Sequence, residues 1–264
     1  MIHIATVHFK TDMWVDLQLR RLAAHLDRPY RVHAYLEGDA AASADRFDDP
    51  VPGEKIPHWQ KLDDLAARVC AEADPDDVLL FLDGDAFPIA DLGAGLDRML
   101  SAHPLAAIRR PENCGDTFPH PSFCATTPRF WQEMGATWVA GYRVQDCRGE
   151  LVTDTGANLL KLLEDRQVDW LPLSRTNARN LHPVLFGVYA DLIYHHGAGF
   201  RRTLTRVDMI AVEEEARRRS GDGEVPPELL AQLTHDHQHR NIDLTMSVYR
   251  EALADDDFWR RLFY

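Results

Sequence analysis

The stretch that decides the fold is "VLLFLDGDAFPIADL", residues 78–92. Its first five residues are all apolar and predict a buried strand. Asp83 and Asp85 follow at once, with only Gly84 between them. Two carboxylates this close repel each other and shift each other's pKa. In open α/β sheets ligands bind beyond the carboxyl ends of the strands, so we expect a compensating cation at this point.

Strands and helices alternate on both sides of this stretch. Apolar or alternating runs predict strands, and apolar residues at helical spacing predict helices between them. The expected strands cover residues 2–7, 31–36, 78–82 and 105–109, and the expected helices cover 14–26, 58–73 and 92–102. Residues 48–57 are rich in Pro and Asp and predict a loop. This alternation indicates an α/β fold with a mostly parallel central sheet.

The regular alternation of predicted strands and helices ends after residue 110. A Pro-rich segment without periodicity, residues 110–123, predicts a long functional loop. Further along we expect strands at 122–127 and 190–196, helices at 128–134 and 154–166, and mostly helix after 206 with a break at 221–227. The predicted organisation is therefore one domain over 1–205, followed by a helical C-terminal extension over 206–264. Within the domain, the change after residue 110 separates a first half, 1–110, from a second half, 111–205.

Composition excludes several classes of protein. A net charge of −13 argues against nucleic acid as a partner, because phosphate binding needs a basic surface. Cys70, Cys114, Cys124 and Cys147 have no metal-type spacing, and we expect reduced thiols that serve in packing. The N-terminus lacks a signal-peptide pattern, and no run of about 18 apolar residues predicts a transmembrane segment. These features favour a cytoplasmic protein, and the preference for Arg, Ala and Asp is typical of a GC-rich bacterial genome.

The acidic pair suits a hard divalent cation. Gly84 allows a tight turn, so that Asp83 and Asp85 can converge on one ion. Mg²⁺ or Mn²⁺ would cancel their repulsion and leave coordination positions for phosphate oxygens. We therefore expect a nucleoside diphosphate carried by the metal. A turn with two solvated acids is the alternative interpretation.

Four segments in order resemble the GT-A-fold glycosyltransferases. They are the D-x-D stretch at 78–92, "HPSFCATTPRFW" at 120–131, "DTGANLL" at 154–160 and "YHHGAGFR" at 194–201. The resemblance lies between the retaining, glycogenin- and galactosyltransferase-like group and the inverting, family-2-like group. Gly156 stands where the retaining group has a second acid, and the final Lys-Pro-Trp of that group is absent. The resemblance implies a single Rossmann-like GT-A domain, a UDP-sugar donor, and a sugar, lipid-linked or small-molecule acceptor. It also implies that 1–110 is the nucleotide-sugar-binding half and 111–205 the acceptor-side half.

The resemblance also implies a third metal ligand and a catalytic acid. His195 and His196 are adjacent and face opposite sides of a strand, and the H-x-G-x-G pattern selects His195. Asp154 would be the general base in an inverting enzyme and would position the donor sugar in a retaining one. Glu112, in the Pro-rich loop, is the rival base.

The remaining candidates line the expected donor and acceptor sites. For the donor they are Thr6, His8, Lys61, Asp83, Gly84 and Arg109, and for the acceptor Asp116 and His120. A second metal site at His235 and His239 is the less favoured interpretation of a polar helix face. A nucleotidyltransferase would use similar acids, but "ATVHFKTD" at 5–12 lacks its Gly-rich phosphate loop. A non-catalytic nucleotide-sugar-binding protein is the other alternative, and the full Asp and His set argues against it.

Overall fold

A seven-stranded sheet forms the centre of the computed structural model, which describes residues 1–199, 203–221 and 223–263. Its strands in spatial order are β10 (Leu171–Leu173), β6 (Ala106–Ile108), β7 (His120–Thr126), β4 (Val78–Asp83), β1 (Ile2–Lys10), β2 (Tyr30–Gly38) and β3 (Asp49–Pro52). Strand β7 is antiparallel to β4 and β6, and the other pairs are parallel. The structure confirms the predicted α/β class and the mostly parallel sheet.

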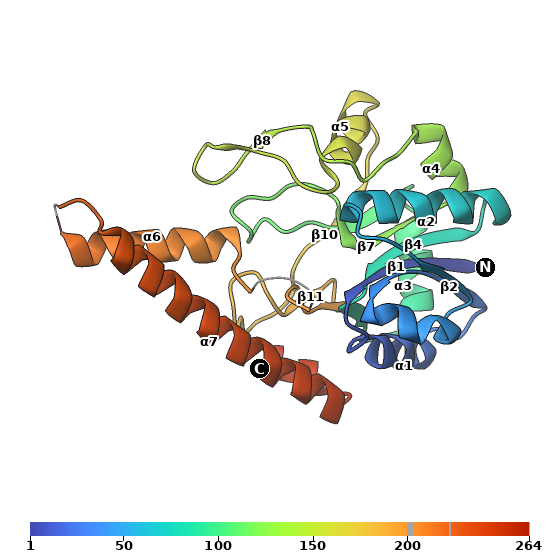
Figure 1. The fold of residues 1–264 in the computed structure, drawn as a ribbon. Helices are drawn as coiled ribbons and strands as arrows, with labels where there is room; N and C mark the ends of the chain where they lie inside the picture. Colours follow the sequence, from blue (N-terminus) through green and yellow to red (C-terminus); the bar gives the residue numbers. More distant parts are fainter. Residues whose placement is uncertain (200–202, 222, 264) are drawn as a thin grey trace.

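Helices cover both faces of this sheet (Figure 1). One face packs against α1 (Val15–His25) and α3 (Leu92–Leu100) in one apolar core. The other face packs against α2 (His58–Glu72), α4 (Pro128–Met134) and α5 (Ala157–Asp165) in a second core. Along β1, Ile4 belongs to the first core and Ala5 to the second. Even-numbered residues of β1 therefore face α1, and odd-numbered residues face α2.

A second, three-stranded sheet lies beside the end of β4. It consists of β11 (Gly187–Tyr189), β12 (Ile193–His195) and β5 (Ala86–Pro88), with β12 antiparallel to both neighbours. The single strand predicted at 190–196 is wrong in its start, because Ala190 and Asp191 have positive φ and form a turn before β12. Strand β12 brings the late histidines alongside the residues that follow the Asp pair.

The C-terminal part of the chain is helical, as predicted. Helices α6 (Arg206–Ser220) and α7 (Pro227–Ala254) form a hairpin that projects from the rest of the molecule (Figure 1). Only the outer part of the hairpin projects, because Val248 and Ala252 of α7 share an apolar core with Phe87 and Tyr194 of the second sheet. The short elements η1 (Asp39–Arg46), β8 (Val144–Gln145), β9 (Leu151–Val152) and η2 (Phe258–Leu262) complete the described chain.

Two further local predictions are wrong. The loop predicted at 48–57 contains β3, since an edge strand tolerates prolines whose missing N–H groups are not needed. The helix predicted from Asp154 begins at Ala157, because Gly156 has a φ of 93° and cannot belong to the helix. Among the described helices, none combines the length and apolar character that crossing a bilayer requires.

The prediction that all four cysteines are reduced is also wrong. Cys114 and Cys147 form a disulfide that joins the Pro-rich loop to the β8–β9 hairpin. Sequence spacing gave no sign of it, because the two residues are 33 positions apart and are brought together only by the fold. Cys70 and Cys124 are free, and burial raises the pKa of the Cys124 thiol well above its usual range, so it is a packing residue.

Candidate functional site

Asp83, Asp85 and His195 converge where β4 ends and β12 passes beside it. The Nε2 atom of His195 lies 3.8 Å from an oxygen of Asp83 and 3.5 Å from an oxygen of Asp85. One ligand atom from each of the three residues lies within 4.8 Å of the others. Residues from two sheets, far apart in the sequence, therefore present two carboxylates and one imidazole to a common point.

Asp85 is held in place from both sides. Its Oδ2 atom accepts hydrogen bonds from the backbone N–H groups of Gly197, at 3.1 Å, and Gly199, at 2.9 Å. Burial alone would raise the pKa of Asp85, but His195 and the N–H of Gly199 lower it well below the usual range. A side chain at position 199 would come within 2.8 Å of Asp85, so glycine is required for this approach. Asp85 is therefore an ionised carboxylate with a fixed orientation.

Gln18 of α1 holds the turn between the two acids, and sequence reasoning missed it. Its side-chain amide donates to the backbone carbonyls of Asp83 and Ala86 at 2.8 and 2.9 Å. Its side-chain oxygen accepts from Thr6 at 3.2 Å and lies 3.1 Å from His8. A polar residue on the apolar face of a predicted helix was the signal that could have found it.

Thr6 and His8 do not lie where the donor-binding prediction needs them. Both are even-numbered residues of β1, fully buried, and they face Gln18 and α1. The neighbouring odd-numbered residues, Val7 and Phe9, line the cavity instead. Thr6 and His8 thus lie on the face of β1 that points away from the cavity, and the alternation of a strand alone does not say which face lines a cavity.

His196 faces away from the acidic pair. Its ring packs against Trp14 and Phe186, with ring centres 4.6 and 4.9 Å apart, and its Nδ1 atom lies 2.9 Å from the Tyr194 hydroxyl. Burial lowers the pKa of His196 to about 3, so the ring is neutral at neutral pH. The geometry brings His195, and not His196, to the Asp pair. Arg201, the last residue of the "YHHGAGFR" segment, lies outside the described residues.

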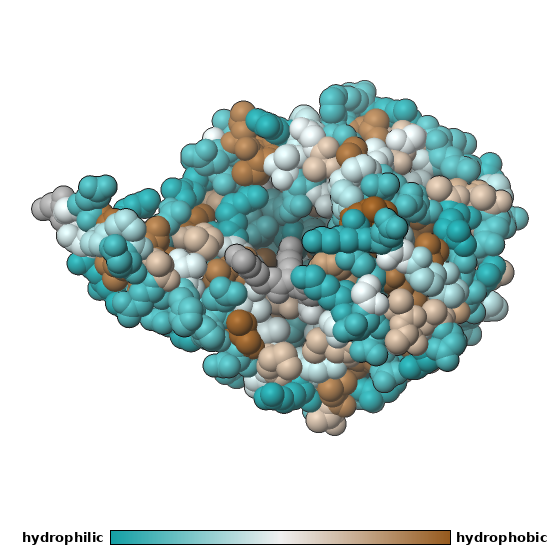
Figure 2. All heavy atoms as spheres, in the orientation of Figure 1, coloured by the Kyte–Doolittle hydropathy of each residue, from teal (hydrophilic) through white to brown (hydrophobic). Residues whose placement is uncertain are grey.

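A cavity of about 380 Å³ opens over the three converging residues. Figure 2 shows the surface hollowed near the middle of the view, with hydrophilic residues around the hollow. The described residues that line the cavity are Val7, Phe9, Lys55, Ile56, His58, Lys61, Asp83, Gly84, Asp85, His120, Pro121, Asp154, Thr155, His195, Gly197 and Gly199. The predicted residues Lys61, Gly84, His120 and Asp154 therefore share one cavity with the acidic pair.

Two basic residues flank the acidic end of this cavity. Lys61 is buried, forms an ion pair with Glu37, and places its ammonium 4.8 Å from the centre of the Phe9 ring. His58, at the first turn of α2, lies 3.2 Å from the Oδ1 atom of Asp83. Sequence reasoning did not single out His58, although it precedes Lys61 by three residues and so shares its helix face.

Asp154 and His120 form the opposite side of the cavity. The Asp154 side chain accepts from the N–H of Thr155 at 2.8 Å, and the His120 ring centre lies 5.7 Å from that of His195. Gly156, two residues after Asp154, is closely packed, because a Cβ at position 156 would lie 2.1 Å from the Pro119 carbonyl oxygen. Gly156 allows close packing of the Pro-rich loop.

Three predicted residues do not line the cavity that the described residues form. Glu112 accepts a hydrogen bond from the Tyr189 hydroxyl at 2.7 Å. Asp116 is buried against Arg110 at 3.3 Å and accepts from the N–H of Phe118. Arg109 continues from β6, with its backbone N–H on the Leu173 carbonyl. Glu112 and Asp116 therefore have structural partners of their own.

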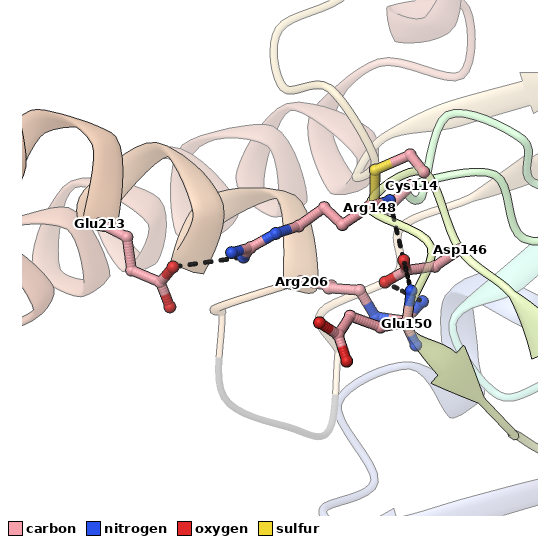
Figure 3. Close-up of a disulfide and its surroundings, with 7 residues drawn as sticks. Cys114, Asp146, Arg148, Glu150, Arg206 and Glu213 are labelled. Atoms are coloured by element: carbon pink, nitrogen blue, oxygen red, sulfur yellow. Dashed lines mark hydrogen bonds and ion pairs between the residues drawn. A yellow bond between two sulfur atoms is a disulfide. The ribbon is translucent and has the colours of Figure 1, made fainter.

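The disulfide joins the Pro-rich loop to the β8–β9 hairpin, and residues on either side of Cys147 contact α6 (Figure 3). Next to Cys147, Arg148 reaches Glu213 of α6 at 3.2 Å, and Asp146 lies 3.9 Å from Arg206 at the start of α6. Asp146 also accepts backbone N–H bonds from Arg148 and Glu150, which closes the β8–β9 turn. The disulfide thus fixes the Pro-rich loop, which precedes His120 in the chain, to the β8–β9 hairpin, which precedes Asp154.

No protein-family model and no curated protein sequence matches the chain. Among solved structures, the galactosyltransferase LgtC in complex with donor and acceptor sugar analogs has 14% identity and a TM-score of 0.35, covering 50% of this chain and 59% of LgtC. A fragment of S. aureus TarS in complex with UDP has 10% identity and a TM-score of 0.37, covering 52% of this chain and 50% of that one. The chain thus matches between half and three fifths of these two proteins. TM-scores of this size add no weight to the geometry described above.

Proposed function

We propose that this protein is a metal-dependent GT-A glycosyltransferase that moves a hexosyl group from a nucleoside diphosphate sugar to an acceptor hydroxyl. The observation that carries the proposal is the convergence of Asp83, Asp85 and His195 in a cavity that Asp154 also lines. UDP is the proposed nucleotide, on the sequence resemblance of the D-x-D segment. The acceptor is proposed to be a sugar, a lipid-linked sugar or a small molecule.

The donor set fits a divalent cation of the Mg²⁺ or Mn²⁺ class. Two carboxylates and one imidazole give an O,O,N set, and the imidazole favours Mn²⁺. When bound, the ion would neutralise the diphosphate that leaves as the bond to the sugar breaks. Asp83 and Asp85 would hold the ion together with His195, and Gly197 and Gly199 would keep the Asp85 carboxylate oriented.

The other cavity residues would divide between donor and acceptor. Val7 and Phe9 would form the apolar wall for the nucleotide, with Lys61 and His58 near the diphosphate. Residues 1–110 would then form the donor half and 111–205 the acceptor half, with 206–264 as a helical extension. This division places the cavity at the boundary of the two halves, where donor and acceptor must meet.

Asp154 is the proposed catalytic carboxylate, because it lines the cavity and Glu112 does not. If the reaction inverts the anomeric centre, Asp154 takes the proton of the acceptor hydroxyl as that oxygen attacks the sugar. If it retains the configuration, Asp154 holds the donor sugar in position. The anomeric configuration of the product, read by NMR, distinguishes the two courses.

The experiment is a donor panel with Mn²⁺ in which the released product is identified. Sugar transfer, or hydrolysis of the donor in the absence of acceptor, releases a nucleoside diphosphate. Asp83→Asn combined with Asp85→Asn should abolish this release, while Asp45→Asn, an exposed acid outside the cavity, should leave it unchanged. Release of a sugar 1-phosphate would instead indicate nucleotidyl transfer, and equal activity in the double variant would refute the metal role.

The cytoplasm is the proposed compartment, and the disulfide provides its test. Disulfides persist mainly in oxidising compartments, and this bridge therefore weighs against the proposal. Alkylation distinguishes the cytoplasm from an oxidising compartment. Thiols are blocked in intact cells to prevent exchange, and the cysteines that were free are counted after denaturation. Four free cysteines would support a cytoplasmic protein, and two would indicate an oxidising compartment.

A further inference from the structure

A second group of metal-ligating side chains lies at the edge of the sheet opposite the cavity. His3 is near the start of β1, His33 is near the start of β2, and Glu72 is the last residue of α2. One ligand atom from each lies within 4.8 Å of the others, and both histidines are buried. We name these three residues the His3–His33 site. It is separate from the sugar-transfer proposal and uses none of its residues.

The two imidazoles are linked to each other and to two carboxylates. The Nδ1 atom of His3 lies 3.0 Å from the Nε2 atom of His33. The remaining nitrogen of His3 is 3.2 Å from Asp77, and the remaining nitrogen of His33 is 3.1 Å from Asp49. The order is thus carboxylate, imidazole, imidazole, carboxylate.

Counting protons shows that this chain of contacts needs an extra positive charge. Each contact with a carboxylate needs a proton on the imidazole nitrogen, and the contact between the rings needs one more. Two neutral imidazoles carry only two protons in total, so three hydrogen bonds require one imidazolium.

The same arrangement suits a metal ion between the rings. Histidines that bind metals usually place their second nitrogen on a carboxylate, which fixes the ring and makes the other nitrogen a better ligand. Asp77 and Asp49 occupy these outer positions. Two nitrogens on one tetrahedral zinc ion lie about 3.3 Å apart, close to the 3.0 Å found here.

Glu72 can supply a third ligand. Its Oε1 atom lies 3.6 Å from the Nδ1 atom of His33, on the side of Asp49, and 43% of its side chain is exposed, so it can rotate toward the point between the two rings. It also forms an ion pair with Arg31, and the 3.6 Å between the two groups is long enough for this pair to break when Glu72 rotates. Asp49 stays on its outer position, because Arg68 binds both of its oxygens at 2.7 and 3.0 Å.

We propose that His3, His33 and Glu72 bind a borderline transition-metal cation of the Zn²⁺ class. Two imidazoles and one carboxylate select Zn²⁺ over the harder Mg²⁺. The ion would join β1, β2 and α2 at the edge of the sheet away from the cavity. It would stabilise the fold without taking part in the transfer, since binding to the folded state alone raises stability.

The test uses Co²⁺ and Zn²⁺ on a tag-free chain in which the other sites are disabled. The background carries Asp83→Asn, Asp85→Asn and His239→Ala, because the Nε2 atoms of the exposed His235 and His239 also lie 3.0 Å apart. We expect one Co²⁺ per chain with the intense visible bands of tetrahedral coordination, displacement by Zn²⁺, and a higher melting temperature with Zn²⁺. No binding in this background would overturn the proposal.

The decisive variant is Glu72→Gln. Because Glu72 is exposed, its replacement should not disturb folding. It should weaken Co²⁺ binding at least about 10-fold, the lower end of what losing even an outer carboxylate partner costs. Glu133→Gln, an exposed acid on α4, is the matched control and should bind as the background does. His33→Gln should abolish binding, with circular dichroism to verify folding. Equal affinity in Glu72→Gln and its control would remove Glu72 from the site and refute the proposal.

Discussion

Asp85 is almost completely buried, with one oxygen on two backbone N–H groups and the other turned toward His195. Its orientation therefore depends on the loop after β12 as much as on β4. Gly199 is the tightest point of that loop, because a Cβ there would lie 2.7 Å from the Cβ of Asp85. A small change of backbone at this position should displace the carboxylate.

Gly199→Ala should weaken Mn²⁺-dependent UDP binding by at least about 10-fold, equivalent to roughly 1.4 kcal/mol. The added methyl group would push Asp85 away from the metal position. Calorimetry of UDP binding with and without Mn²⁺ measures the effect. Gly223→Ala is the control, since its Cβ would meet nothing closer than 3.4 Å. Equal losses in both variants would contradict the specific role of Gly199.

The residues of the candidate site differ in how well the sequence alone predicts their positions. The Asp pair follows a wholly apolar strand, so its position at a strand end could be predicted. Gln18 and His58 could not be predicted, because each contacts the acidic turn only once the fold has formed. The face on which Thr6 and His8 lie could not be predicted either, since a strand buried on both sides shows no polar alternation.

At the scale of elements, the start of α5 depends on one close packing contact. Gly156 has a φ of 93° and lies against the Pro119 carbonyl. This glycine lets the Pro-rich loop pass directly over the helix N-terminus. The loop in turn leads into β7, which begins with His120.

Gly156→Ala should destabilise the protein by roughly 3 kcal/mol or more, from backbone strain at positive φ and from the clash together. Gly135→Ala separates the two causes, because Gly135 also has positive φ but nothing lies within 4 Å of its Cβ position. We expect that variant to lose only roughly 1–2 kcal/mol. Urea denaturation measures both. Equal losses would mean that the Pro119 contact costs nothing.

Asp208 joins α6 to the rest of the molecule. Its Oδ1 atom lies 2.8 Å from His182 and 2.9 Å from His237 of α7, and Thr205 bonds to its other oxygen. Burial would raise the pKa of Asp208, but the bonds from His182 and Thr205 lower it. The ionised carboxylate therefore stabilises the fold above its unfolded pKa of about 3.9, and this contribution is lost as the pH falls through the lower folded value.

Asp208→Asn should cost roughly 2–4 kcal/mol at pH 7, as expected for one partner of a buried charged network. The difference from the unmodified protein should shrink below about pH 4, where the carboxylate advantage fades. Urea denaturation at pH 7 and pH 3 gives both numbers. Asp243→Asn, an exposed residue of α7, is the control. A cost that did not depend on pH would show that charge is not the cause.

The elements themselves were largely predictable, and their ends were not. Helix α4 lies where Pro at its first position predicted it, from Pro128 to Met134. Strand β3 was missed, since only its pairing with β2 makes Asp49–Pro52 a strand. Pairing across the sheet is a tertiary effect, and local propensity does not contain it.

At the scale of the whole molecule, the Cys114–Cys147 disulfide holds together the two segments that lead to His120 and to Asp154, both of which line the cavity. Closing a loop with a sequence separation of 33 residues stabilises the fold by roughly 3–4 kcal/mol in the chain-entropy model. The bridge could not be predicted, because four cysteines allow three pairings and none is local. Its partner segments also contact α6 through Arg148 and Glu213.

The double variant Cys114→Ser, Cys147→Ser should lower the free energy of unfolding by up to roughly 3–4 kcal/mol. It should also weaken acceptor binding more than UDP binding. The donor side depends on β1, β4 and α2, which the bridge does not touch. Thermal denaturation and the KM for acceptor against the Kd for UDP measure the two effects. Cys70→Ser, a half-buried free thiol, is the control. An equal loss of donor and acceptor affinity would contradict the separation of the two sides.

Assembly of the proposed metal-binding group also depends on the order in which the chain is made. His195 follows Asp85 by 110 positions (195 minus 85), and β12 must pair with β5 before the imidazole can reach the carboxylates. At a synthesis rate of about 5–20 residues per second, the histidine emerges about 5–20 s after the acids. A nascent chain would thus carry two exposed carboxylates with weak metal affinity for most of that interval. The ion would be captured late, once the second sheet has closed over the first.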